Sequence, residues 1–181
     1  MQIQKIKILA ITGSTRNNSS NFKILKFISE QISREFEVEI FEALAEIPHF
    51  NPDLDNDNLP EKVLLFRNKI KSAEGILICT PEYVFSLPGS LKNALEWCVS
   101  TTIFANQKAG LITASASGEM AHQQLLLIMN TLEAKFEDNK QLLIKGIRGK
   151  IDEEGKIINQ ETKNEIQEFI SNFENQFTTE I

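Results

Sequence analysis

The segment from Thr12 to Asn21 gathers hydroxyl and amide side chains and one arginine directly before a stretch of helical periodicity. Backbone N–H groups at a helix start carry partial positive charge, hydroxyls donate hydrogen bonds to phosphate oxygens, and a guanidinium adds a full positive charge. These residue types in this order predict a binding site for a phosphate monoester. The side chains expected to contact it are Ser14, Thr15, Arg16, Ser19 and Ser20.

This segment has two other interpretations. Its spacing matches neither the GxxxxGK[ST] loop of nucleoside triphosphate enzymes nor the GxGxxG turn of dinucleotide-binding folds, and no lysine stands where it would reach a β- or γ-phosphate. A terminal monophosphate is therefore favoured over a triphosphate or a pyrophosphate. Capping of the helix by Ser19 or Ser20 explains the same hydroxyls without any ligand, and the sequence leaves this alternative open.

Two further loops begin where apolar runs end. Residues 81–86 follow the apolar run 75–79, and residues 114–118, Ala-Ser-Ala-Ser-Gly, follow the run 109–113. Small side chains let backbone N–H groups come close to a flat ring. Together with a phosphate loop at a distance, two such loops suit flavin mononucleotide (FMN), whose phosphate and ring system lie far apart.

All three loops need a scaffold that brings them to one edge. Short runs rich in β-branched residues alternate with longer stretches of helical period, which is typical of a parallel sheet covered by helices on both faces. The predicted strands are 6–11, 38–41, 75–79, 109–113 and 142–144, the last extending to about 146. The predicted helices are 20–34, 60–72, 88–100, 119–135 and 161–177.

Right-handed crossovers turn these elements into an α/β fold of three layers, α/β/α, with a doubly wound sheet of five parallel strands in the flavodoxin-like order. Small molecules bind such sheets outside the carboxyl ends of the strands, which is where the three loops lie. The length of 181 residues suits one domain, 1–181, with a sizeable core. Core-facing stripes are predicted in the first helix, at Phe22, Leu25, Ile28 and Ile32, and in the last, at Ile166, Phe169, Ile170 and Phe173.

Composition excludes several classes of partner. The net charge of −6 and the lack of a basic run argue against nucleic acid and anionic membranes. Cys79 and Cys98 have no metal-ligand or CxxC spacing and suit reduced core thiols. His49 and His122 show no ligand spacing either, so no metal is expected. The polar N-terminus runs straight into a strand without a signal-peptide pattern, so we expect a cytoplasmic protein.

Two long motifs resemble the NADPH-dependent FMN reductase family, flavodoxin-like proteins that include quinone, azo and chromate reductases. Residues 13–21, GSTRNNSSN, are similar to the family's G-S-x-R-x-x-S-x-N phosphate loop. Residues 81–97, PEYVFSLPGSLKNALEW, are similar to its P-E-Y-N-x-S-x-P-G-x-L-K-N-x-x-[DE]-W segment. The resemblance spans nearly the whole chain. This chain departs from the family at Val84, where asparagine is usual, and at Ala121-His122, where many members have a glycine pair.

The resemblance implies an FMN-dependent NAD(P)H oxidoreductase with FMN as cofactor and NADPH or NADH as co-substrate. Hydride would pass from the nicotinamide to the flavin and electrons on to a small acceptor, a free flavin, quinone, azo dye or metal oxyanion, with no catalytic side chain and no metal. The alternative is an FMN-binding electron carrier or interaction protein without appreciable NAD(P)H turnover. The family also implies a homodimer or homotetramer.

Carried over by position, the family motifs imply a set of flavin-binding residues. Those at the phosphate and its loop are Ser14, Thr15, Arg16, Ser19, Ser20 and Asn21. Those beside the ring are Pro81, Glu82, Tyr83, Val84, Phe85 and Ser86 on one side and Ser115, Ser117 and Gly118 on the other.

Several residues have a structural alternative. Tyr83 suits either the ring loop or a subunit contact, and Trp97 suits a core or a subunit contact. We expect Asn93 to hold the loop that precedes its helix, and His122 to be a solvated residue in the first turn of the next helix. The connection from Glu42 to Leu59 is long enough to be functional, although a solvated surface loop explains it as well.

Overall fold

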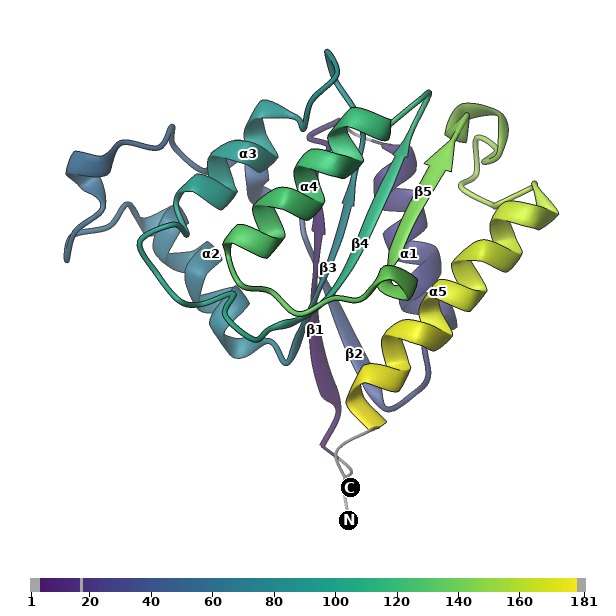
Figure 1. Cartoon of the computed structure of the whole chain (residues 1–181), viewed down its shortest axis with the longest axis horizontal. Helices are drawn as coiled ribbons and strands as arrows, with labels where there is room; N and C mark the ends of the chain where they lie inside the picture. Colours follow the sequence, from purple (N-terminus) through teal and green to yellow (C-terminus); the bar gives the residue numbers. More distant parts are fainter. Residues whose placement is uncertain (1–3, 17, 179–181) are drawn as a thin grey trace.

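Five parallel strands form the centre of the molecule (Figure 1). The computed structural model describes residues 4–16 and 18–178, and residues 1–3, 17 and 179–181 lie outside that description. The strands are β1 (Ile6–Thr12), β2 (Phe36–Phe41), β3 (Gly75–Thr80), β4 (Lys108–Ser115) and β5 (Gln141–Lys145). Their order is β2-β1-β3-β4-β5, which confirms the predicted flavodoxin-like sheet. Each strand extends one or two residues beyond at least one predicted end.

Helices cover both faces of the sheet because every central strand is buried on both sides. The helices are α1 (Ser20–Gln31), α2 (Glu61–Ser72), α3 (Gly89–Glu96), α4 (Glu119–Thr131) and α5 (Gln160–Thr178). Apolar side chains of α2, α3 and α4 form one core, and those of α1 and α5 form the other. Three helices, α1, α3 and α4, end earlier than predicted. The spacing of apolar residues that predicts a helix continues into the turn that follows each of them. At the end of α1, for example, Ile32 is buried although its backbone is already extended.

The predicted core stripes are confirmed with one correction. All four residues of the α5 stripe are buried, as are Leu25, Ile28 and Ile32 of the α1 stripe. Phe22 is only half-buried and lines a surface depression instead, while Ile24 is fully buried. At the start of α1 the side chain that faces the core is that of Asn21, which is buried, and Phe22 therefore points away from the core.

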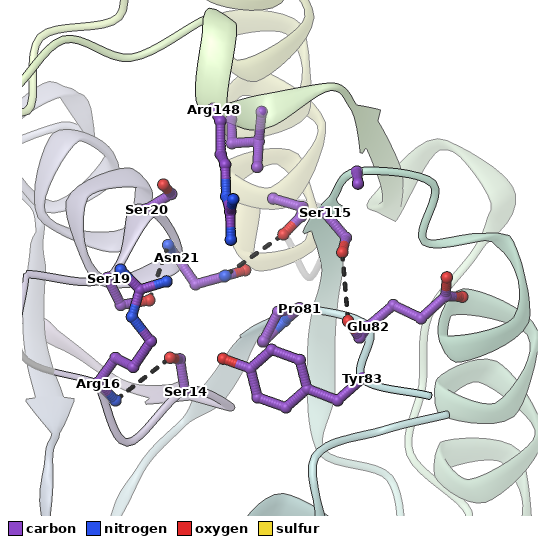
Figure 2. Close-up of a pocket in the computed structure, with 13 residues that line it drawn as sticks. Ser14, Arg16, Ser19, Ser20, Asn21, Pro81, Glu82, Tyr83, Ser115 and Arg148 are labelled. Atoms are coloured by element: carbon purple, nitrogen blue, oxygen red, sulfur yellow. Dashed lines mark hydrogen bonds between the residues drawn. The ribbon is translucent and has the colours of Figure 1, made fainter. Parts of the chain in front are cut away.

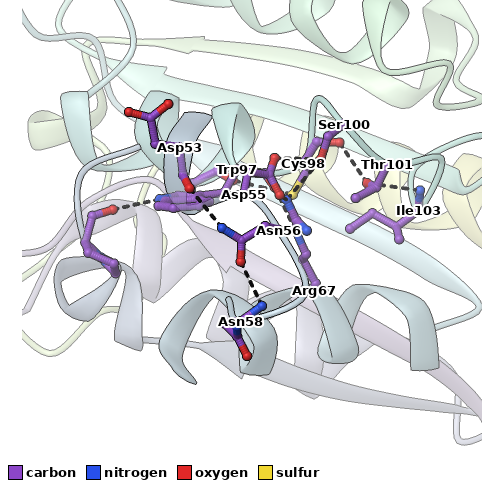
Figure 3. Close-up of polar contacts among 12 residues, drawn as sticks. Asp53, Asp55, Asn56, Asn58, Arg67, Trp97, Cys98, Ser100, Thr101 and Ile103 are labelled. Atoms are coloured by element: carbon purple, nitrogen blue, oxygen red, sulfur yellow. Dashed lines mark hydrogen bonds and ion pairs between the residues drawn. The ribbon is translucent and has the colours of Figure 1, made fainter. Parts of the chain in front are cut away.

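The connection from Glu42 to Leu59 contains two short 3₁₀ turns and is fastened to α3 (Figure 3). The Asn93 side chain accepts a hydrogen bond from the Phe50 N–H at 2.7 Å and donates one to the Pro48 carbonyl at 3.0 Å. Trp97 is fully buried, its Nε1 donates to the same carbonyl at 2.7 Å, and the Phe50 ring packs edge-on against it. Asn93 therefore holds this connection and not the loop directly before α3, which corrects the expectation from sequence. Trp97 is confirmed as a core residue.

A nearly buried ion pair fastens the same connection to α2. Arg67 Nη2 lies 2.8 Å from Asp55 Oδ1, and the two side chains are 12% and 8% exposed. Arg67 also donates to the Trp97 carbonyl through Nε at 2.7 Å, and the Ser100 hydroxyl donates to Asp55 Oδ2 at 2.6 Å. These contacts hold the connection in place, although most of its residues from 51 to 58 are exposed to solvent.

Both cysteines are buried free thiols, as predicted. Burial raises the pKa of the Cys98 thiol to about 12, so it is unreactive at neutral pH. Within residues 4–16 and 18–178, no helix is both long and apolar enough to cross a membrane. Over the same residues, no three His, Cys, Asp or Glu side chains are grouped to hold a metal ion.

Candidate functional site

A pocket of about 280 Å³ opens where the carboxyl ends of β1, β3 and β4 meet (Figure 2). Nine of its lining residues were predicted from sequence: Ser14, Arg16, Ser19, Ser20, Asn21, Pro81, Glu82, Tyr83 and Ser115. Four more, Ala114, Ala116, Ile147 and Arg148, were not. The fold therefore brings the phosphate loop and the ring loops to one cavity, as the parallel sheet requires.

The loop after β1 presents hydroxyls and one guanidinium at the start of α1. Ser19 is the N-cap of the helix, and its Oγ accepts a hydrogen bond from the Asn21 N–H at 3.2 Å, so the capping alternative is confirmed for this residue. Ser14 Oγ accepts from the Arg16 N–H at 3.4 Å. The loop passes so close to β3 that a Cβ at Gly13 would lie 2.3 Å from Thr80 Oγ1. Glycine is needed there for space, and the tight approach fixes Ser14 in the pocket wall.

Asn21 contributes its side chain to the structure beneath the pocket. Its Nδ2 donates to the Ala114 carbonyl at 3.3 Å, and its Oδ1 accepts from the Cys79 thiol at 3.2 Å. The side chain is buried, so these two bonds join the start of α1 to the ends of β3 and β4. Asn21 thus positions the phosphate loop.

The loop after β3 turns sharply between Tyr83 and Ser86, whose backbone N–H and C=O groups bond reciprocally at 3.0 Å. The two residues at the turn, Val84 and Phe85, have φ values of 51° and 57°. This left-handed conformation suits glycine and asparagine and strains a β-branched valine. Gln124 of α4 braces the turn, since it donates to the Phe85 carbonyl and accepts from the Ser86 hydroxyl.

Relief of that strain is a direct prediction. Val84→Asn is expected to stabilise the folded protein by about 1 kcal/mol, because asparagine adopts the left-handed conformation at low cost and Val84 is 94% exposed. Urea unfolding of the variant and the parent measures the change. Val99→Asn is the control, because Val99 is also an exposed valine but its backbone is not in the left-handed conformation. This substitution should change the stability little. Equal effects of the two substitutions would contradict strain at Val84.

Glu82 holds the second and third loops together. Its carboxylate accepts hydrogen bonds from the Gly118 N–H at 3.2 Å and the Ala121 N–H at 3.0 Å, at the start of α4. The N-cap residue of α4, Gly118, has no side chain that could cap the helix. The Glu82 carboxylate, from the loop after β3, caps it instead. The Ser115 hydroxyl also donates to the Glu82 carbonyl, at 3.4 Å.

The remaining predicted residues lie around the pocket and not in its wall. Thr15 lines an adjacent depression of about 210 Å³ that shares Ser14 and Arg16 with the pocket. The Ser86 hydroxyl bonds to Gln124, and Gly118 is buried at the end of the third loop. The exposed residues outside the wall are Val84, Phe85 and Ser117.

His122 differs from the expectation of a solvated residue. It is half-buried, and its Nδ1 lies 3.0 Å from Thr113 Oγ1. Burial lowers the pKa of its imidazole and so favours the neutral form. It packs against β4 and does not line the pocket.

Arg148 is a charged residue of the pocket wall that sequence reasoning missed. It lies in the short 3₁₀ turn Ile147–Gly149 after β5, and its side chain points into the pocket from the side opposite Arg16 (Figure 2). A signal was available, because the residues after a fifth parallel strand must emerge at the same sheet edge as the three loops.

Comparison with known proteins places this geometry in a family. Residues 6–147 match the family model described as NADPH-dependent FMN reductase. The chain belongs to the NADPH-dependent FMN reductase family. Its sequence is 28% identical over 171 residues to the NADH:(hydroxy)cinnamate reductase subunit CrdA of Vibrio ruber, covering 91% of this chain and 84% of that one. It is 28% identical over 174 residues to a 2-hydroxy-1,4-benzoquinone reductase of a Burkholderia species, covering 93% and 94%.

The fold of this FMN reductase family member also matches a solved flavoenzyme. The NAD(P)H:(acceptor) oxidoreductase FerB from Paracoccus denitrificans superimposes with a TM-score of 0.71 at 22% identity, covering 93% of this chain and 94% of that one. Family membership makes this chain an FMN-dependent oxidoreductase that uses NAD(P)H.

Proposed function

We propose that the pocket binds FMN with its phosphate between Arg16 and the start of α1 and its ring against the loops after β3 and β4. In that complex the chain would act as a reductase for a small planar acceptor such as a quinone. One observation carries this proposal. The pocket combines a cationic end, lined by hydroxyls and guanidinium groups, with an end lined by Pro81, Tyr83 and residues 114–116, where backbone N–H groups at the start of α4 bind the Glu82 carboxylate.

The residues present fit FMN. Among the described residues, Thr12 Oγ1 is buried without a hydrogen-bond partner, and Thr12 lines the depression that Ser14 and Arg16 share with the pocket, so one hydroxyl near the proposed phosphate position is unpaired. Among the described residues that line the pocket, Glu82 is the one acidic residue, and its carboxylate is engaged by α4, while Glu42 lines the adjacent depression. A dianionic phosphate would therefore meet no unpaired carboxylate in the described pocket wall.

Bound FMN would supply the redox chemistry, because a flavin accepts a hydride from a nicotinamide and passes electrons to an acceptor. The chain's own residues would bind and orient it. Ser14, Ser19 and Arg16 would hold the phosphate, while buried Pro81 and half-exposed Tyr83 would position the ring. Because Glu82 joins the second and third loops, the two walls of the ring site would keep a constant separation.

A homodimer is part of the proposal. Exposed apolar residues gather beside the ring end of the pocket, on the turn after β3 and on α4, where Gln124 links the two elements: Val84, Phe85, Met120 and Leu127. A second subunit covering them would bury this apolar surface and shield the ring. We also propose a single domain and a cytoplasmic location, the latter because both thiols are free and NAD(P)H is an intracellular reductant.

The experiment that tests this function is a visible spectrum of the purified protein with FMN, freed of excess flavin, before and after anaerobic addition of NADPH and then NADH. We expect bound flavin that is bleached within seconds, and reoxidation by a quinone. Bound flavin that neither nicotinamide bleaches would instead indicate an electron carrier. The absence of bound flavin would overturn the assignment of the pocket.

A further inference from the structure

We propose that Arg148 is a second ligand for a phosphate monoester in this pocket, and that it makes binding selective for the phosphorylated form of the ligand. The inference rests on the proposed function. It concerns a residue outside both motifs, on the loop that follows β5, and it assigns that loop a role in binding.

The position of Arg148 is determined by the backbone around it. Gly146 adopts a left-handed conformation with φ of 65°, and its N–H donates to the Ala116 carbonyl at 3.1 Å, which joins the loop after β5 to the third pocket loop. The next residue, Ile147, is 4% exposed and packs into the core between α1 and α5. With Ile147 fixed inward, Arg148 projects from the turn into the pocket (Figure 2).

The pair of guanidinium groups at this end of the pocket has no ion-pair partner among the described residues. Within residues 4–16 and 18–178, neither the Arg16 nor the Arg148 guanidinium has a hydrogen bond or an ion pair, and the two approach the pocket from opposite sides. The positive end of α1 lies between them, at Ser20. The two guanidinium groups repel each other, although the protein as a whole has a net charge of −6. A dianion bound between them would attract both and so replace this repulsion by attraction.

The ligand chemistry is therefore a phosphate monoester, held by guanidinium groups on two sides and by hydroxyls and helix N–H groups on a third. Two sources carry that chemistry in this reaction, the 5′-phosphate of FMN and the 2′-phosphate of NADPH. Riboflavin and NADH are the matched ligands that lack it.

The test compares Arg148→Gln with the parent by titration of FMN and of riboflavin, followed by KM for NADPH and NADH on FMN-saturated enzyme. We expect the Kd for FMN to rise about 10-fold to 100-fold while that for riboflavin changes less than about twofold, because one charge-assisted hydrogen-bond partner is lost. Arg148→Lys should recover part of the affinity. Lys150→Gln is the matched control, since it removes the same charge two residues away, outside the pocket wall.

Each outcome decides between the alternatives. A rise in KM confined to NADPH, with FMN binding intact, would support the phosphate site and assign it to the nicotinamide cofactor. Equal loss of FMN and riboflavin affinity would overturn the proposal in favour of a structural role, and so would unchanged constants for all four ligands. Parent protein that binds neither flavin would overturn the proposed function itself, whereas normal FMN binding by Arg148→Gln with unchanged NADPH kinetics would overturn only the role of Arg148.

Discussion

Replacing Ser14 and Arg16 together by alanine is expected to weaken FMN binding by about 3 to 6 kcal/mol, which corresponds to a Kd roughly 10²-fold to 10⁴-fold higher. Each residue would supply one charge-assisted hydrogen bond to the phosphate, at about 1.5 to 3 kcal/mol. Ser14 is buried in the pocket wall and Arg16 is exposed, so neither side chain is a large part of the core. Fluorescence titration of FMN, with riboflavin beside it, measures the effect.

The chain provides a matched control for this double variant at the other end of the same helix. Ser33 and Arg34 are adjacent, exposed and distant from the pocket wall, and Ser33→Ala/Arg34→Ala removes the same groups. It should leave FMN affinity unchanged. An FMN affinity that is the same in the Ser14/Arg16 variant as in the parent would show that the phosphate binds elsewhere. A parallel loss of riboflavin affinity would indicate damage to the loop.

Arg67→Met is expected to lower the free energy of unfolding by about 3 kcal/mol, because it leaves the nearly buried Asp55 carboxylate without its cation. The substitution also removes the hydrogen bond to the Trp97 carbonyl and loosens the connection from Glu42 to Leu59 (Figure 3). Urea unfolding at pH 7 measures the change. Lys62→Met is the matched control, because Lys62 lies on the same helix and pairs with Glu46 of the same connection while both side chains are about half exposed. That solvent-screened pair should contribute little, so the unfolding free energy of Lys62→Met should stay close to that of the parent.

The Arg67 effect should depend on pH in a definite direction. Burial by itself raises the pKa of Asp55. Hydrogen bonds from Ser100 and Arg67, together with the Arg67 charge, lower it by more than burial raises it, so the pKa in the folded protein is below its ordinary value of 3.8. A lowered folded pKa stabilises the protein above pH 3.8, and this stabilisation is lost as the pH falls through the folded value. The difference between parent and Arg67→Met should therefore shrink in acid. A difference that stays constant down to pH 3 would contradict this origin.

Some of the candidate site was predictable because its residues are contiguous in the chain. Residues 13–21 and 81–83 carry their chemistry in local order, and a strand that ends before each of them places both at one sheet edge. Apart from Thr15, the predicted residues that do not line the pocket wall come directly after residue 83 or lie in the loop after β4. Val84 and Phe85 sit at a turn that points outward, and turn type depends on the length between paired residues as well as on composition.

Other errors came from contacts between distant segments. Asn93 and His122 were assigned from their neighbours in sequence, yet Asn93 bonds to a connection that begins 51 residues earlier, at Glu42, and His122 bonds to the preceding strand. Arg148 was overlooked because no local motif surrounds it. A single arginine after a strand becomes informative once the sheet order places β5 next to β4.

By itself, then, the sequence of this chain determined the class of fold, the order of its strands and the chemistry of two loops, because hydrophobic period and backbone requirements are local properties. Tertiary structure alone decided which of those side chains face the same cavity. The outward turn at Val84, the cap that Glu82 supplies to α4 and the projection of Arg148 opposite Arg16 each depend on packing between elements far apart in the chain. Such packing is set by the shape and burial of the whole core, and no single segment encodes it.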